Sequence, residues 1–321
     1  LRSKCPIVKE PNYGVLAITG YDEAATVLKD TDTFSSCIAV AGPFPPLPFT
    51  PEGDDITDQI TEHRPLMPMF EHMVTMDPPD HTNARSLLNR LLTPSRLKEN
   101  EDFMWRLADR QLDEFIAQGH CEFIAEYAKP FSLLVIADLL GVPEEDHENF
   151  RVVLGAERPG SRVGALDHET VGTNPLEWLD DKFSAYLEDR RREPRDDVLT
   201  ELAGAKYPDG STPEIIEVVR TATFLFAAGQ ETTTKLLSAA MKVLVDRPDI
   251  QRKLRQDRSL IPTFIEESLR MESPVKSDFR LVRRSTRVGD LDLPAGSMVL
   301  VLPGAVNRDP SRFENPHEFQ L

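Results

Sequence analysis

Residues 224–240 read FLFAAGQETTTKLLSAA, the middle of a long apolar segment that small and polar residues interrupt. Apolar residues at helical spacing predict one continuous helix that runs to about Asp246, where Arg247-Pro248 ends it. The sequence STPE at 211–214 predicts its start, with a hydroxyl cap, a proline in the first turn and a glutamate three residues on. At about 1.5 Å per residue, such a helix is roughly 50 Å long and would cross a whole domain.

The interruption itself is a patch with almost no side chain, formed by Ala227, Ala228 and Gly229. Glycine costs about 1 kcal/mol relative to alanine inside a helix, so a flat group pressed against the backbone would explain its presence. The Thr232 hydroxyl lies four residues after Ala228 and is expected to bond to that carbonyl and loosen the turn. With Glu231 beside it, the pattern predicts a proton relay next to a flat cofactor. The alternative is a bent helix with a polar, solvent-facing stripe.

Composition limits the class of protein. The chain has 321 residues with 40% hydrophobic content, enough for one large domain or two smaller ones. It carries 37 basic and 54 acidic residues, a net charge of −17, which would repel a nucleic acid. No apolar run reaches the ~18 residues that a membrane helix needs, and the N-terminus is not signal-like. We therefore expect a cytoplasmic protein without a membrane span or a nucleic-acid partner.

The three cysteines, Cys5, Cys37 and Cys121, are odd in number and show no CxxC spacing. A disulfide framework or a structural zinc site is therefore not expected. His120 and Cys121 are neighbours whose side chains point in different directions, so this pair alone does not build a metal site.

The remainder of the chain is predicted to be mainly helical. A short strand turns into a helix over 18–30, and helices follow Asp77-Pro78-Pro79 and Thr93-Pro94. The stretch 130–143, PFSLLVIADLLGVP, predicts a buried helix that ends at Gly141. The Gly-rich stretch 155–175 is interpreted as a surface loop.

Two other segments depart from helical spacing. The proline-rich stretch 41–55, AGPFPPLPFTPEGDD, is predicted to be a loop that covers a pocket with Phe44, Leu47 and Phe49. Alternation over 280–304, with a turn at Pro294-Ala295-Gly296, predicts strands near the C-terminus. The expected fold class is mainly α with small β-sheets.

Charged residues form two spaced pairs. His81 and Arg85 lie four apart on one helix face and would repel if both were charged, unless an anion lies between them. A carboxylate ligand is one interpretation and solvated surface the other, and Arg280 is a further basic candidate. Glu267 and Arg270, in EESLR, lie three apart, a spacing that alone indicates a surface ion pair worth under about 1 kcal/mol.

Four pieces occur in one order: DPPDHTNAR, AAGQETT, EESLR and NRDPSRFENPHEF. In that order and at these separations, the chain resembles a bacterial cytochrome P450 over essentially its whole length. The resemblance implies a single domain over 1–321, with the long helix crossing it. It implies that Thr232 is the alcohol delivering protons to dioxygen at the haem and that Glu231 is the acid beside it. Ala228 and Gly229 would border the haem and the oxygen groove.

The resemblance also implies roles for the charged pairs. His81, Arg85 and Arg280 match residues that bind the haem propionates. Glu267 and Arg270 match a buried pair that braces the haem-side core and serves folding and haem retention. The expected substrate contacts are Phe224 and Ala228 on the long helix and Val275 and Ser277 after the EESLR helix.

The chain departs from the family pattern at its C-terminal end. The family binds haem iron through a cysteine thiolate on a Gly-rich loop, which should lie downstream of FENPHEFQL, whereas this chain stops at Leu321. Cys121, in QGHCEF, precedes the long helix and is rejected as the ligand. The axial cysteine is therefore expected beyond Leu321, outside a chain that lacks the C-terminal haem-ligand region. The third partner of the Glu267–Arg270 pair is unassigned, since Glu318 stands where some relatives have arginine.

The resulting functional hypothesis is a haem-thiolate monooxygenase that inserts one atom of O2 into an apolar small molecule. Electrons would come from NAD(P)H through a ferredoxin reductase and a ferredoxin, because the chain shows no flavin or nicotinamide fingerprint. One alternative is a peroxide-using enzyme of the same fold, against which the Glu231-Thr232 pair argues. Another is a non-catalytic haem- or ligand-binding relic, should the natural protein end at residue 321.

Overall fold

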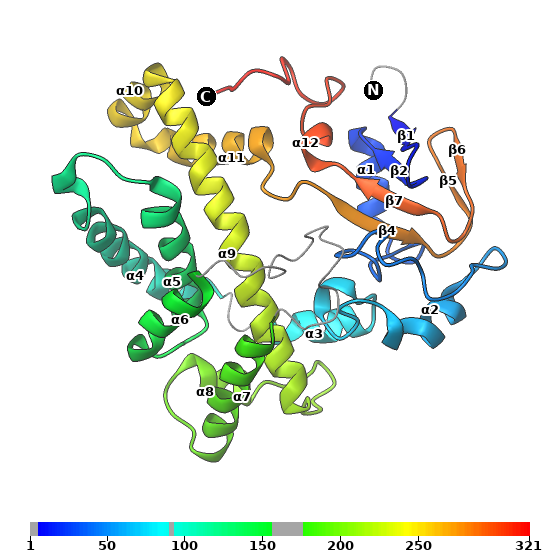
Figure 1. The fold of residues 1–321 in the computed structure, drawn as a ribbon, viewed down its shortest axis with the longest axis horizontal. Coiled ribbons are helices and arrows are strands. Elements are labelled where there is room, and N and C mark those ends of the chain that lie inside the picture. Colours follow the sequence, from blue (N-terminus) through cyan, green and yellow to red (C-terminus); the bar gives the residue numbers. More distant parts are fainter. Residues whose placement is uncertain (1–5, 90–92, 156–175) are drawn as a thin grey trace. The chain divides into compact units, whose positions relative to one another are not determined.

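The computed structural model describes residues 6–89, 93–155 and 176–321, which fall into two compact units. The first unit joins residues up to Pro78 with Ala239–Leu321, and the second is Pro79–Ser238. The helix α9 (Ile215–Asp246) contributes residues to both units (Figure 1).

The first unit is built on a five-stranded sheet with the order β1-β2-β7-β4-β3. Only the pair β2 and β7 is parallel, while the other neighbours are antiparallel. The strands are β1 (Ile7–Lys9), β2 (Leu16–Ile18), β3 (Phe34–Ser35), β4 (Asp278–Val282) and β7 (Met298–Val301), with a separate hairpin of β5 (Thr286–Val288) and β6 (Leu291–Leu293). The predicted C-terminal strands are confirmed, and Gly296 takes the positive φ that the Pro294–Gly296 turn requires.

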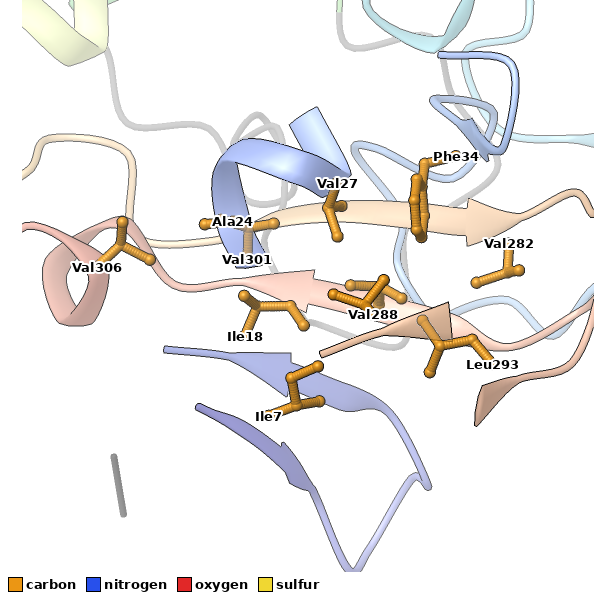
Figure 2. Close-up of a cluster of buried hydrophobic side chains, with 11 residues drawn as sticks. Ile7, Ile18, Ala24, Val27, Phe34, Val282, Val288, Leu293, Val301 and Val306 are labelled. Carbon is orange, nitrogen blue, oxygen red and sulfur yellow. The ribbon is translucent and has the colours of Figure 1, made fainter. Parts of the chain in front are cut away.

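One helix packs against the five-stranded sheet and forms an apolar core with it. Ala24 and Val27 of α1 (Tyr21–Lys29) are buried in a cluster with Ile18 of β2 and Val301 of β7 (Figure 2). Residues from the N-terminal and C-terminal parts of the sequence therefore share one core, which also includes Phe34. The predicted strand-to-helix segment at 18–30 is thereby confirmed.

A second apolar cluster of the same unit uses the proline-rich segment. Leu47 and Phe49 pack against a cluster of buried residues that includes Ile56, Met67 and Leu281. The segment contains neither helix nor strand, as its prolines predict. Leu47 and Phe49 thus belong to this core, which the prediction of a pocket-covering loop did not include, while Phe44 packs edge-to-face against Tyr13 with ring centroids 4.9 Å apart.

The remaining helices of the first unit are α2 (Thr57–His63), α10 (Pro248–Gln256), α11 (Ile261–Glu272) and α12 (Pro303–Val306). Ile250, Leu254 and Phe264 form a small buried cluster on α10 and α11. Val243 and Leu244, near the end of α9, pack against it. This packing fixes α11, the helix that carries the EESLR motif.

The second unit is helical. Its described helices are α3 (Asp80–Leu88), α4 (Pro94–Asp113), α5 (Lys129–Leu139), α6 (His147–Gly155), α7 (Glu177–Arg192), α8 (Val198–Ala203) and most of α9, with the π-helix η4 (Ile124–Ala128) leading into α5. The predicted buried helix is α5, and Gly141 after it has φ 75°. The loop expected at 155–175 lies outside the described residues except for its first residue, Gly155, which closes α6.

The central helix α9 has 32 residues, so the predicted length is confirmed. The predicted start is wrong in detail. Ser211 donates its hydroxyl to Asp209, and Glu217 instead accepts the backbone N–H of Glu214 at 2.7 Å. A glutamate one turn further along therefore satisfies a free N–H at this helix end.

Candidate active site

The middle of α9 changes from buried to exposed at the small-residue patch. Val219, Ala222 and Phe226 are fully buried, whereas Ala228 is exposed in the described structure. Alanine contributes little side-chain surface, so this part of the helix presents mostly backbone. Such a surface could accept the broad face of a planar group, and the flat cofactor predicted there stays a prediction.

The predicted hydrogen bond of Thr232 is confirmed. Its hydroxyl donates to the Ala228 carbonyl at 2.9 Å, the i→i−4 contact that threonine makes in helices. The helix nevertheless stays α-helical from 215 to 246, so the expected loosening does not interrupt it. The hydroxyl therefore lies at the small-residue patch on an intact helix.

Glu231 has a partner that the sequence analysis did not consider. Its carboxylate pairs with Lys235 at 2.8 Å, and the two side chains are 51% and 47% exposed. Ala228, Glu231 and Lys235 recur at helical spacing and form one exposed stripe of α9. The acid is thus next to Thr232 in sequence, while its side chain is held towards the following turn.

Gly229 has a packing reason of its own. A Cβ built on Gly229 would lie 3.2 Å from both Cγ1 and Cδ1 of Ile136, on α5. That separation is tighter than ordinary van der Waals contact, so the glycine lets α9 and α5 approach closely. Its neighbour Ala228, not Gly229, is the exposed member of the patch.

The cations predicted to hold an anion lie on two elements. His81 and Arg85 are on α3, where Leu87 and Leu88 are buried, leaving His81 half-buried and Arg85 exposed. Their spacing of four residues places them on one face of the helix.

Arg280 lies on β4 and is largely buried. Its guanidinium pairs with the Asp278 carboxylate and donates to the Phe279 carbonyl at 2.7 Å. An anion at Arg280 would therefore share this guanidinium with Asp278.

Glu267 and Arg270 form a bidentate pair on α11. Two hydrogen bonds of 2.7 Å join them, and the side chains are only 11% and 12% exposed. The bond to Glu267 raises the pKa of Arg270, although burial opposes this. The pair is therefore a shielded charge pair, as the family resemblance implies, and not the surface ion pair that the spacing alone indicates.

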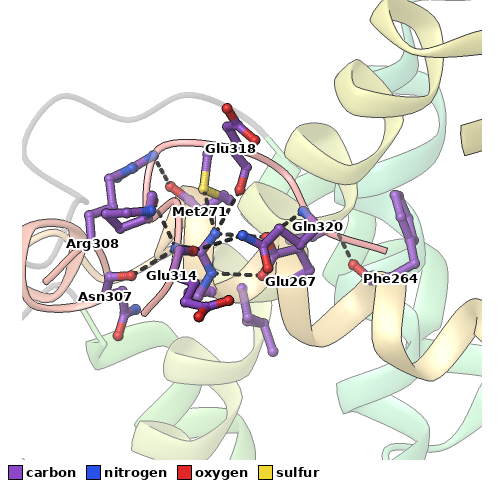
Figure 3. A network of polar contacts seen from close by, with 12 residues as sticks. Phe264, Glu267, Met271, Asn307, Arg308, Glu314, Glu318 and Gln320 are labelled. Carbon is purple, nitrogen blue, oxygen red and sulfur yellow. Dashed lines mark hydrogen bonds and ion pairs between the residues drawn. The ribbon is translucent and has the colours of Figure 1, made fainter. Parts of the chain in front are cut away.

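The partners missing from the sequence analysis belong to the segment after α12. Arg270 donates to the backbone carbonyls of Asn307, Pro316 and Glu318 at 2.9 to 3.0 Å (Figure 3). Glu267 accepts the backbone N–H of Gln320 at 2.7 Å. Backbone groups thus complete the pair, and Glu318 takes part through its carbonyl. Because any residue supplies a carbonyl, no side-chain pattern could have revealed these contacts.

The predicted substrate contacts differ in exposure. Phe224 on α9 is half-buried, and Val275 and Ser277, between α11 and β4, are exposed, Val275 by 50%. Single exposed apolar side chains are common on protein surfaces, and the described chain has several others, so the role of Val275 as a substrate contact stays a prediction.

The described cysteines do not provide a metal ligand. Cys37 is buried, and burial raises the pKa of its thiol to about 11, which disfavours the thiolate that binds metals. Cys121 is half-buried, and Cys5 lies outside the described residues. Across the described ranges, there is no group of three or more His, Cys, Asp or Glu side chains able to hold a metal ion. Within the same ranges, every helix is too short or too polar to cross a bilayer.

Comparison with known proteins identifies this set of motifs. The family model described as Cytochrome P450 matches residues 174–321. Cytochrome P450 144 of Mycobacterium tuberculosis is 31% identical over the full chain, which covers 72% of that protein.

Solved structures agree with these matches. Substrate-free cytochrome P450 CYP150A6 of Mycobacterium marinum is 69% identical with a TM-score of 0.92, covering 99% of this chain and 74% of that one. CYP109E1 of Bacillus megaterium in complex with testosterone is 27% identical with a TM-score of 0.80, covering 99% of this chain and 78% of that one.

Three features together define a haem-dependent class of oxygenases. They are a mainly helical chain with small sheets, a Glu-x-x-Arg pair, and a central helix that carries a threonine. The chain belongs to the cytochrome P450 family, whose members are haem-binding monooxygenases. The predicted fold class is confirmed. The described residues fit haem in part: Ala228 offers an open small-residue surface and Arg85 an exposed cation, whereas neither described cysteine fits the axial thiolate.

Proposed function

We propose that the full-length protein inserts one atom of O2 into an apolar small molecule, within a single functional domain that includes residues 1–321. The other oxygen atom leaves as water, and the balance requires two electrons and two protons. The observation that carries the proposal is the Thr232 hydroxyl, bonded to the carbonyl of the exposed Ala228 in the middle of the long helix α9. The expected cytoplasmic location and the ferredoxin donor are parts of this proposal.

Bound haem would supply the oxygen chemistry, with an axial thiolate favouring O–O cleavage. His81, Arg85 and Arg280 would hold its propionates through charge-assisted hydrogen bonds. Ala228 and Gly229 would border it, with Ala228 as the exposed member, and the axial cysteine is expected beyond Leu321. Glu267 and Arg270 serve the fold, since they tie α11 to the segment 307–320.

Thr232 would hold and pass protons at the small-residue patch. Its hydroxyl donates to the Ala228 carbonyl at rest, so a change of partner frees the proton for transfer. Glu231 would resupply it after leaving Lys235. A carboxylate that exchanges between a lysine and a hydroxyl links bulk water to the patch.

The substrate class is argued from apolar side chains. Phe224, Ala228 and Val275 are candidates for apolar contacts, with Ser277 as a polar neighbour. CYP109E1, at 27% identity, binds testosterone, a mainly apolar molecule. We therefore propose a mainly apolar small-molecule substrate.

The coupling of electrons to product tests the proposed activity. The full-length protein, loaded with haem, is expected to show the carbon-monoxide spectrum of thiolate-ligated iron. With ferredoxin, its reductase and an apolar substrate identified by a haem spectral shift, about one product should form per NADPH consumed. Product formed with hydrogen peroxide but never with NADPH and ferredoxin would instead indicate the peroxide-using alternative. Absence of the carbon-monoxide spectrum would contradict a haem-thiolate enzyme.

Replacement of Arg85 tests the propionate site. Arg85→Ala in the full-length protein is expected to release haem about tenfold faster, because a hydrogen bond to a charged group contributes about 1.5–3 kcal/mol. Transfer of haem to an excess of apomyoglobin measures the rate. Arg110→Ala, at an exposed arginine of α4, is the matched control. Equal release rates in the two variants would remove Arg85 from the site.

A further inference from the structure

Two contacts link α9 to α5 and to the end of the π-helix η4 that precedes it, one on either side of Thr232. Before it, Gly229 lies so close to Ile136 that an added Cβ would be 3.2 Å from two of its side-chain atoms. After it, the Thr234 hydroxyl donates to the Gln230 carbonyl at 2.9 Å and makes a longer, secondary contact of 3.4 Å with the Ala128 carbonyl. Both contacts belong to the second unit.

The two contacts define the register of the helix pair. Gly229 meets Ile136 of α5, whereas Thr234, further along α9, meets Ala128, just before α5, so the two segments run in opposite directions here. Five residues separate Gly229 from Thr234, about 7.5 Å along the helix. A helix held at both ends of that distance has little freedom to slide or rotate between them, where Thr232 lies.

The second contact lies among buried residues, and the polar groups there have hydrogen-bond partners. Ala128 is fully buried and Thr234 is 8% exposed. The Ala128 carbonyl also accepts the Ser132 hydroxyl at 2.8 Å. Ala128 is the last residue of the π-helix η4, a rare irregularity that is often found at functional sites. Thr234 and Ala128 each have a shorter hydrogen-bond partner on their own side, so the 3.4 Å contact adds a link between the two segments to groups that are already satisfied.

We propose that Ile136 and Thr234 are positioning residues, which hold α9 in the register that places the Thr232 hydroxyl for proton transfer. This inference rests on the proposed proton-transfer function of Thr232. Packing of Ile136 on Gly229 acts on one side, and the 3.4 Å contact of the Thr234 hydroxyl with the Ala128 carbonyl acts on the other. A Cβ at position 229 would require Ile136 or α9 to shift by a few tenths of an ångström.

The first test adds and then removes a steric conflict. Gly229→Ala places a methyl group against Ile136, and Ile136→Ala removes both atoms that it meets. Because a misplacement of about 1 Å can cost on the order of 100-fold, we expect Gly229→Ala to raise peroxide released per NADPH about threefold to tenfold. The double variant should return towards the wild-type ratio although its melting temperature falls. A merely structural role predicts that coupling and melting temperature fall together, and that result would overturn the proposal.

The second test removes the hydroxyl bond with little change in shape. Thr234→Val in the haem-loaded full-length protein should raise peroxide per NADPH and speed hydrogen exchange in the peptide 226–236. Thr221→Val is the matched control, because Thr221 is also buried on α9 and bonds only to the Glu217 carbonyl of its own helix among the contacts described. Equal exchange in the two variants would contradict the fixed register.

Thr232→Ala, measured beside them, separates the two proposals. If it releases peroxide while Thr234→Val and Gly229→Ala do not, proton transfer stands and the positioning role is overturned. If Thr232→Ala leaves coupling unchanged, the proton-transfer function fails, and hydrogen exchange alone then decides whether α5 fixes the register of α9.

Discussion

The variant Thr232→Ala is expected to keep consuming NADPH and O2 while releasing hydrogen peroxide in place of product. The Thr232 hydroxyl is the only polar group of this side chain, and it lies 2.9 Å from the carbonyl of Ala228, at the small-residue patch. Positioned proton-transfer groups contribute about 10²–10⁴-fold to rate, so product per NADPH should fall on the order of tenfold or more. Parallel assays of product, peroxide and NADPH in the full-length protein measure the change.

Two substitutions distinguish loss of the hydroxyl from general disturbance of α9. Thr232→Ser keeps a hydroxyl that can bond to the same carbonyl, and should keep most of the coupling. Thr233→Ala changes the next residue along and should leave the ratio of product to NADPH near wild type. An unchanged product yield per electron in Thr232→Ala would rule out the assigned role.

Features set by neighbours in the chain were predictable from the sequence. The length of α9 follows from an apolar pattern that Arg247-Pro248 ends, and the Thr232 bond joins residues four apart. The order of the four motifs predicted the family, and the comparisons confirm it. In each case the necessary information lies within a few turns of helix or in the order of short segments.

Features that join distant segments were not predictable. Gly229 suggested a flat ligand, whereas its contact with Ile136 arises from the packing of α5 on α9. Glu267 and Arg270 were matched to a family pair whose third partner was unassigned, and backbone groups fill that place. Sequence patterns describe side chains, so a site completed by carbonyl and N–H groups leaves no trace in them.

Loss of Arg270 is expected to destabilise the fold strongly. Arg270→Ala leaves the shielded Glu267 carboxylate without its cation and frees three backbone carbonyls that the guanidinium ties to α11. Breaking a buried charge pair from one side costs about 3–5 kcal/mol, a large part of the ~5–15 kcal/mol that stabilises a typical protein. Urea unfolding of the full-length protein measures the loss, and limited proteolysis should show cleavage within 307–320.

A surface pair of the same unit provides the control. Arg247 is also bidentate to a carboxylate, that of Asp249, but both side chains are exposed, so Arg247→Ala should change stability little. Arg270→Lys keeps the charge and loses the planar fork that reaches Glu267 and the carbonyls together, so it should recover only a small part of the stability. If Arg270→Ala unfolds at the same urea concentration as Arg247→Ala, the Glu267–Arg270 pair does not hold the segment after α12 to α11.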